Sequence, residues 1–213
     1  MQEYKLTIKR KNVKNISIRV ISFNEVVLTL PIFASKKRAL EFVKSKEKWI
    51  QKALKRQEKP FVLEDRATIF YLGKAYSIAL HQDKKQRVEI KDDIFHIYYK
   101  DDKERVLEKF LRESAKEIFL KLIKKWEAKL DKKVEKVSIK KMKTRWGSCN
   151  TQKRYINLNL KLIHKSIDVI EYIILHEMAH LTYPNHSKSF HDYVEKYMSD
   201  WRERDKKLKN MSK

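Results

Sequence analysis

Residues 167–180 read IDVIEYIILHEMAH, a stretch that is apolar on nearly every side and ends with two histidines four positions apart. An apolar helix of this kind lies inside a domain, because a surface helix keeps one polar side. Ser166 stands where an N-cap belongs, and Pro184 follows where a helix stops. We therefore expect a buried helix over residues 167–182 with two imidazoles on one face.

The end of this helix carries the motif His176-Glu177-Met178-Ala179-His180. Residues four apart share a helix face, so His176 and His180 can reach one metal ion. In zinc hydrolases two imidazoles bind Zn²⁺, and the neighbouring carboxylate removes a proton from the zinc-bound water. The composition of the chain gives only about 0.02 accidental matches to this pattern. The motif predicts a zinc-dependent hydrolase in which Glu177 is catalytic.

A catalytic zinc needs a third protein ligand and one open position. His186 lies six residues beyond the motif, after a proline has turned the chain. Four of the seven histidines fall between residues 176 and 191, which isolated core histidines do not explain. Glu195 and Glu203 are the competing ligands, since carboxylates also bind zinc. We expect His176 and His180 as two of the metal ligands, with His186 as the leading candidate for the third.

The first hundred residues read mainly as strands. Alternating apolar positions predict strands at 16–20 and 26–30, joined by a turn at 22–25. An amphipathic helix capped by Ser35 is expected over 36–57. The remaining strands of this region are expected at 68–72, 76–80, 87–90 and 94–99.

Helices dominate the rest of the chain. The longest helical pattern covers 103–130, and strands are expected at 136–142 and 155–162. The latter strand could lie at a sheet edge or in its interior. A last helical stretch begins after Ser187. We predict an α+β protein with a β-rich N-terminal region over residues 1–100 and an α+β region over 101–213.

The chain is strongly basic, with 51 Lys+Arg against 28 Asp+Glu and a formal net charge of +23. Residues 1–60 alone hold 16 basic and 5 acidic residues. Such a surface attracts polyanions such as nucleic acids, although lysine runs also occur on ordinary solvated helices. The single cysteine, Cys149, excludes an internal disulfide and is expected to be a structural thiol. No apolar stretch suits a signal peptide or a membrane span, so we expect a soluble, cytoplasmic protein.

Several segments together resemble the YgjP-like zinc metallopeptidases, which are related to the SprT-like and WLM peptidases. These segments are TRWGSC at 144–149, INLN at 156–159, HEMAH at 176–180, NHS at 185–187 and Phe190. The resemblance implies a minimal zincin-like core of the gluzincin type over 101–213, zinc on the three histidines, and Glu177 as the catalytic residue. One departure is His191, which stands where an aromatic residue, usually Trp, is expected. We expect it at a helix surface, with a place near the metal as the alternative.

The leading hypothesis is a zinc peptidase acting on peptide or protein substrates. Its oxyanion could be stabilised by Arg145, Tyr183 or Tyr193. One alternative is a nucleic-acid-associated binding module with a structural zinc, and another is a protease recruited to DNA. Glu177 favours catalysis, because a structural zinc site has no need of a carboxylate beside its ligands. The isolated histidines receive no role; they are His81, His96 and His164.

Overall fold

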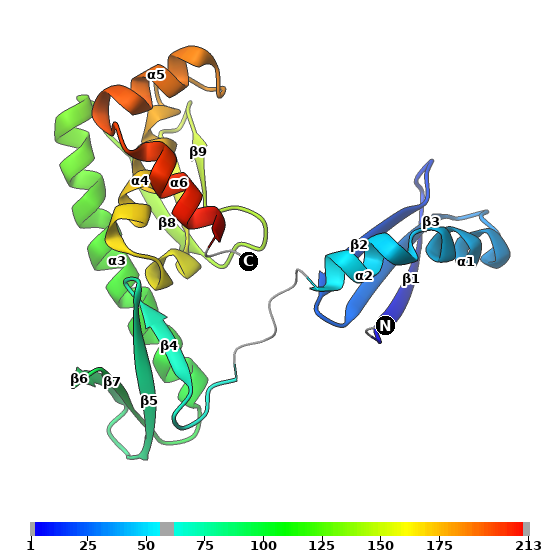
Figure 1. The fold of residues 1–213 in the computed structure, drawn as a ribbon, viewed down its shortest axis with the longest axis horizontal. Helices are drawn as coiled ribbons and strands as arrows, with labels where there is room; N and C mark the ends of the chain where they lie inside the picture. Colours follow the sequence, from blue (N-terminus) through cyan, green and yellow to red (C-terminus); the bar gives the residue numbers. More distant parts are fainter. Residues whose placement is uncertain (1–2, 56–61, 211–213) are drawn as a thin grey trace. The chain divides into compact units, whose positions relative to one another are not determined.

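The computed structural model describes residues 3–55 and 62–210 and confirms a mixed α+β protein. The chain forms two compact units, Met1–Phe61 and Val62–Lys213 (Figure 1). The division falls after Phe61, not at residue 100, where the sequence changes from strands to helices. The reason is that the strands over residues 68–99 pack on the long helix that follows them and share its core.

The first unit is a three-stranded sheet with two helices on one face (Figure 1). Buried residues of its central strand, with exposed fractions of 0–1%, form the core between the sheet and the helices; they are Val26, Leu28 and Leu30. The strand order is β1-β3-β2, with β1 parallel and β2 antiparallel to β3. The elements are β1 (Lys5–Lys11), β2 (Ser17–Ser22), β3 (Glu25–Pro31), α1 (Lys36–Ser45) and α2 (Glu47–Lys55).

The helical part of this unit differs from the prediction of one helix over 36–57. Ser35 does cap α1, since its side chain accepts a hydrogen bond from the backbone N–H of Arg38. The helix then breaks at Lys46, and α2 follows as a separate helix. Within α1 the buried side chains are those of Ala39 and Val43, and Leu40 is exposed. Residues 56 and 57 lie outside the described residues.

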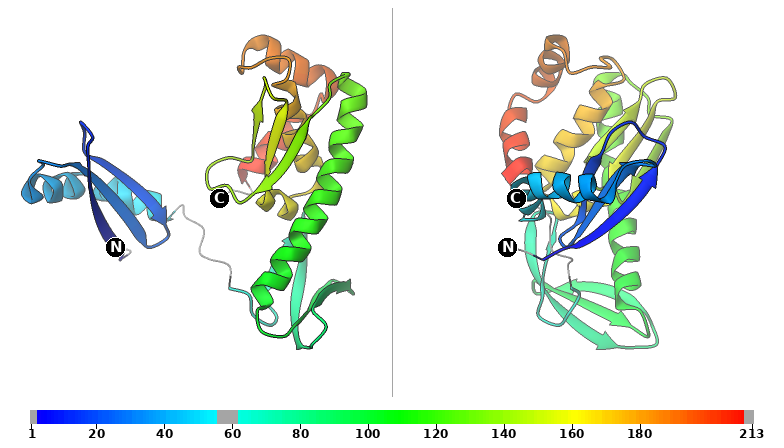
Figure 2. Two further views of the ribbon diagram at one scale, coloured as in Figure 1. Left: turned by 180° about the vertical axis from the view of Figure 1, so that it is seen from behind. Right: turned by 90° about the vertical axis from the view of Figure 1, so that its right-hand side faces the viewer.

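The second unit is built along α3 (Lys103–Leu130), the long helix predicted over these residues. A four-stranded sheet of order β4-β5-β7-β6 packs on the N-terminal part of α3, and a second sheet lies farther along the same helix (Figure 2). All four strands lie where the sequence predicted them. They are β4 (Thr68–Tyr71), β5 (Lys74–Gln82), β6 (Arg87–Lys91) and β7 (Ile94–Tyr99).

The second sheet has the order β8-β10-β9. Its strands are β8 (Lys136–Lys140), β9 (Gly147–Asn150) and β10 (Tyr155–Asn159). The strand predicted at 155–162 is therefore interior, and β9 is an edge strand. β10 ends at Asn159, before residue 162, because the side chain of Asn159 caps the short 3-10 helix η1 (Leu160–His164).

Three helices complete this unit: α4 (Ile167–Ala179), α5 (Lys188–Tyr197) and α6 (Trp201–Asn210). α4 is buried as predicted but ends at Ala179, before Pro184 is reached, with His180 as its C-cap. Ser187 caps α5, and its hydroxyl accepts a hydrogen bond from the N–H of Phe190. Within residues 3–55 and 62–210, no helix has the length and apolar character needed to cross a membrane.

Candidate metal centre

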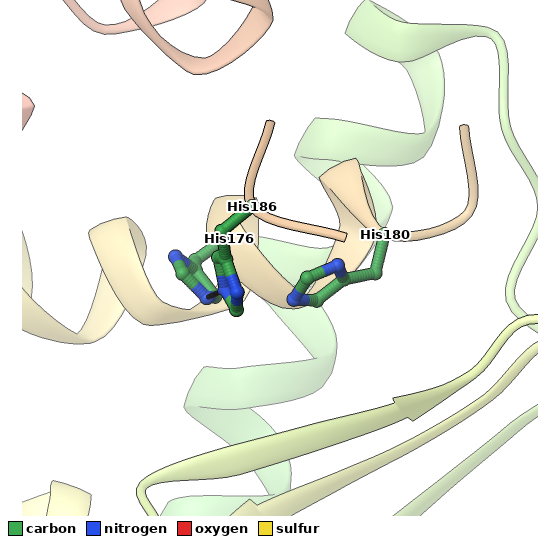
Figure 3. Close-up of side chains that lie close together, drawn as sticks. All are labelled: His176, His180 and His186. Carbon is green, nitrogen blue, oxygen red and sulfur yellow. Dashed lines mark hydrogen bonds between the residues drawn. The ribbon is translucent and has the colours of Figure 1, made fainter. Parts of the chain in front are cut away.

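The end of α4 and the loop after it bring three histidines together. His176 lies in the last turn of α4, His180 caps that helix, and His186 lies just before α5. One ring nitrogen of each histidine lies within 4.8 Å of the other two. Figure 3 shows the rings pointing toward one another. No other group of three or more His, Cys, Asp or Glu residues in the described parts of the chain offers such a set of ligand atoms.

The donor set fits a zinc ion. Nitrogens bound tetrahedrally to zinc at about 2.0–2.1 Å lie roughly 3.3 Å apart. The Nε2 atoms of His176 and His186 are 2.9 Å apart, and no separation in the cluster exceeds 4.8 Å. Small rotations of the rings would therefore match the separations to a metal. Three imidazoles suit zinc or another transition metal better than Mg²⁺ or Ca²⁺.

The surroundings keep the imidazoles in the form that binds metal. Burial, with the nearby charges of His180 and His186, lowers the pKa of His176 to about 3. Burial also lowers the pKa of His186. His180 donates its Nδ1–H to the carbonyl oxygen of Tyr183 at 3.0 Å, which leaves its Nε2 available. Such a second hydrogen bond fixes the ring and the tautomer of a metal ligand.

The ring of Phe190 packs against all three histidine rings. Its ring centroid lies 5.0 Å from that of His176, 4.7 Å from that of His180 and 4.8 Å from that of His186. Phe190 is fully buried on the first turn of α5, where the Ser187 cap fixes the start of the helix. The packing of α5 on α4 therefore holds all three rings against one rigid aromatic side chain.

A second row of rings stands beside the histidines. His191 stacks between His186, at 6.3 Å, and Trp201, at 5.3 Å. Trp201 stacks on Tyr172 at 6.2 Å, and Tyr172 meets His176 edge-on at 6.0 Å. His191 is thus half-buried in the wall of the site, and the expectation of a surface position was wrong. It is wrong because α6 folds back and places Trp201 over it.

α6 also brings a carboxylate to the site, which the sequence analysis missed. The negative charge of Asp205 raises the pKa of His176 and so offsets part of its lowering by burial. Asp205 also accepts a hydrogen bond from the hydroxyl of Tyr172. A carboxylate near a metal-binding imidazole helps to orient it. No spacing along the chain connects residue 205 with residue 176, so only the packing of α6 on α4 reveals this electrostatic interaction.

Glu177 is buried, with 6% of its surface exposed, and its carboxylate lies against β9. A Cβ atom on Gly147 would stand 2.5 Å from its Oε1, so no other residue fits there without displacing the carboxylate. Burial raises the pKa of Glu177 to about 7, and the positive charge of Arg145 acts in the opposite direction. A carboxyl group with this pKa can both accept and release a proton near neutrality.

The loop that carries Arg145 is held by Asn159, a second residue to which the sequence analysis gave no role of its own. Its side-chain amide is buried and donates to the carbonyl oxygens of Met142 and Arg145, both at 2.8 Å. Its carbonyl oxygen accepts from the N–H of Lys161 at 3.1 Å. One side chain therefore ties this loop to the start of η1.

The competing ligands point elsewhere. Glu195 accepts hydrogen bonds from Arg202 at 2.6 Å and from the ring N–H of Trp201 at 3.4 Å. Glu203 is exposed, and neither carboxylate belongs to the three-histidine cluster. His186 is thus the residue that the structure places beside the two motif histidines.

The other residues singled out from the sequence lie as follows. Burial, together with the charge of Glu177, raises the pKa of Cys149 to about 11, which favours a structural thiol over a nucleophile. Tyr183 and Tyr193 contact each other edge-on at 5.4 Å. The histidines without a predicted role lie outside the cluster, with His81 bonded to His96 and His164 to the carbonyl oxygen of Phe70.

Comparison with known proteins gives one family match and several similar structures. The family described as YgjP-like, metallopeptidase domain, matches residues 14–211. A metallopeptidase zymogen, abylysin of Pyrococcus abyssi, is 22% identical with a TM-score of 0.41, over 44% of this chain and 93% of that one. The zymogen of jannalysin from Methanocaldococcus jannaschii is 21% identical with a TM-score of 0.39, over 44% of this chain and 95% of that one. No curated protein matched.

Proposed function

We propose that this chain, which belongs to the YgjP-like metallopeptidase family, is a zinc-dependent peptidase with Glu177 as its general base. The ligands in this proposal are His176, His180 and His186. The observation that carries it is a buried carboxylate that directly follows the first of three converging imidazoles. When bound, zinc supplies a Lewis acid that makes water more acidic and polarises a peptide carbonyl.

Glu177 performs the proton transfers in this proposal. As a carboxylate it removes a proton from the attacking water, and as a carboxylic acid it gives that proton to the amine of the broken peptide bond. Its contact with Gly147 restricts where the carboxylate can lie. The raised pKa of about 7 suits both halves of this exchange.

Arg145 is the favoured partner for the developing negative charge. It is exposed on the loop next to β9, and its positive charge lowers the pKa of Glu177. The hydrogen bond from Asn159 to its carbonyl oxygen holds its backbone in place. Tyr183 and Tyr193 remain the alternatives.

An extended peptide would bind along β9. β9 pairs with β10 on one side only and is a terminal strand of its sheet, so its other edge can accept a substrate strand. β10 cannot do so, because it has partners on both sides. Since β9 begins at Gly147, a peptide bound there would pass close to Glu177.

A Glu177→Gln substitution tests the proposal. The zinc-loaded variant should digest a mixed peptide library about 10²–10⁴ times more slowly than the unchanged protein, because general-base assistance is lost. Its zinc content should remain the same. The matched control is Glu195→Gln, which replaces the competing carboxylate and should alter neither hydrolysis nor zinc content. Full activity in Glu177→Gln would refute the mechanism.

A further inference from the structure

The basic excess of the chain is concentrated in its first unit. Met1–Phe61 contains 16 Lys+Arg and 5 Asp+Glu, a net charge of +11. Val62–Lys213 contains the remaining 35 and 23, a net charge of +12 over more than twice the length. The charge density of the first unit is therefore about double that of the unit with the three histidines. A ligand that is chosen by charge would favour the first unit.

The cations of this unit include a set on one face of its sheet. On β3, alternate residues such as Leu28 are buried under α1 and α2, while Val27 and Thr29 lie on the opposite face. The strand register places Lys9 and Ser17 beside Thr29 on that face, and it places Thr7 and Arg19 beside Val27. The face away from the helices is therefore lined by cations and hydroxyl groups.

We name this surface the basic sheet face and define it by seven residues, which are Lys5, Thr7, Lys9, Lys11, Ser17, Arg19 and Thr29. Its four cations are exposed, and none forms an ion pair with another described residue. Glu25 is the single acidic residue among the described strand positions of this face. Along β1 the side chains of alternate residues repeat every 6.6 Å or so, so the cations form a row.

We propose that the basic sheet face binds the phosphate backbone of nucleic acids. Lysine, arginine and hydroxyl side chains are the groups that contact phosphates, and backbone contacts of this kind carry no sequence information. A row of cations that form no ion pair with a described residue also gains from the release of counterions that nucleic acids hold. An anionic membrane is less well matched, because Val27 is the largest apolar side chain among the paired strand positions on this face of the sheet.

This proposal stands apart from the peptidase site. The cations lie in Met1–Phe61, whereas the three histidines and Glu177 lie in Val62–Lys213. Each unit has its own buried core, so a substitution on the exposed sheet face leaves the core around the histidines unchanged. Binding of nucleic acid and hydrolysis of peptides can therefore fail independently of each other.

Fluorescence anisotropy of labelled oligonucleotides tests the proposal with the full chain. Single-stranded DNA, single-stranded RNA and duplex DNA of about 20 nucleotides or base pairs serve as the probes, over a range of salt concentrations. The test variant combines Lys9→Gln, Lys11→Gln and Arg19→Gln. The control combines Lys37→Gln, Lys44→Gln and Lys48→Gln, which remove the same charge from exposed positions of α1 and α2.

The unchanged protein should bind these probes, and the sheet-face variant should bind at least about tenfold more weakly at low salt. The slope of log affinity against log salt should fall by up to about 2.7 for duplex DNA, or 0.9 for each lost contact. The control should lose less than about threefold. Thermal unfolding and peptide-library hydrolysis should be unchanged in both variants.

Three outcomes would overturn the proposal. The first is that the unchanged protein binds none of the probes. The second is that the control weakens binding as much as the sheet-face variant, because the effect would then follow net charge alone. The third is that the sheet-face variant keeps its affinity for the oligonucleotides but loses binding to phosphatidylserine vesicles, which would assign the face to membranes.

Discussion

Gly147 is one of only two glycines in 213 residues, and it stands where a side chain would strike the proposed catalytic carboxylate. The other, Gly73, has a positive φ of 84°, and a Cβ atom there would stand 2.8 Å from the Cα of Ser166. In a chain that avoids glycine, both remaining glycines therefore occupy places that exclude a Cβ atom. That rarity is the signal in the sequence by which the contact between Gly147 and Glu177 could have been suspected.

A Gly147→Ala substitution should lower peptide hydrolysis strongly while leaving zinc bound. The new methyl group would displace the Glu177 carboxylate, and a misplacement of about 1 Å at a reacting group costs on the order of 10²-fold in rate. The measurement is the rate of peptide-library hydrolysis, together with zinc content. Asn150→Ala, at an exposed position of the same strand, should remain active. Normal activity of Gly147→Ala would mean that the position of Glu177 does not matter.

At the level of single residues, the spacing within HEMAH predicted that His176 and His180 lie together, because a helix fixes both on one face. His186 was preferred to Glu195 and Glu203 because it is only six residues away and because NHS at 185–187 resembles the YgjP-like pattern. Asp205 and Trp201 could not be predicted in this way. Their contacts depend on how α6 returns to α4, which no local pattern encodes.

Among the elements, the loop before β9 depends on one buried side chain. Asn159 stands at the junction of β10 and η1 and donates to two carbonyl oxygens of that loop. Without the Asn159 amide, the partly buried carbonyl oxygens of Met142 and Arg145 would each lose this hydrogen-bond donor. The loop would then lose the support that places Arg145 near Glu177.

The Asn159→Ala variant should be less stable by about 2–3 kcal/mol, since several buried hydrogen bonds are lost at once. Asn157→Ala is the matched control, because its amide makes one hydrogen bond, to the hydroxyl of Ser148 at 3.0 Å. Its cost should be about 1 kcal/mol. Urea unfolding of both variants provides the comparison. Equal losses of stability would show that Asn159 does not hold the loop.

Elements with a strong periodic pattern were predicted best. α3 and the four strands of the first sheet of its unit were found where expected, because their apolar spacing reflects a single buried face. Element ends were predicted less well. α4 ends before Pro184 because the chain turns after His180. There the N–H groups of Leu181 and Tyr183 donate to the carbonyl oxygens of Met178 and Ala179. The break between α1 and α2 at Lys46 was not predicted either.

For the whole molecule, two separate cores have thermodynamic consequences. The core of the first unit contains Leu28 and Ile50, whereas that of the second contains Phe119 and Trp126. The sequence predicted a boundary at residue 100 because strand patterns give way to a long helical pattern there, but shared burial determines which strands belong with which helix. Ligands of the second unit should therefore stabilise that unit alone.

Calorimetry of the full chain should show two unfolding transitions, of which the one with the larger enthalpy belongs to the longer unit. Zinc at about 100 times its dissociation constant adds roughly 2.7 kcal/mol to that unit, or about 5–10 °C in Tm. The smaller transition should not move. In His180→Ala the zinc effect should disappear, whereas His81→Ala, a histidine outside the cluster, should keep it. A zinc shift of the smaller transition would contradict the assignment.

In the proposed site, three histidines and no carboxylate hold the metal. A crystal structure of the zinc-loaded protein, with anomalous diffraction at the zinc edge, tests it most directly. One zinc should lie at about 2.0–2.1 Å from the Nε2 atoms of His176, His180 and His186. A zinc bound by Glu195 or Glu203, with His186 turned away, would contradict it.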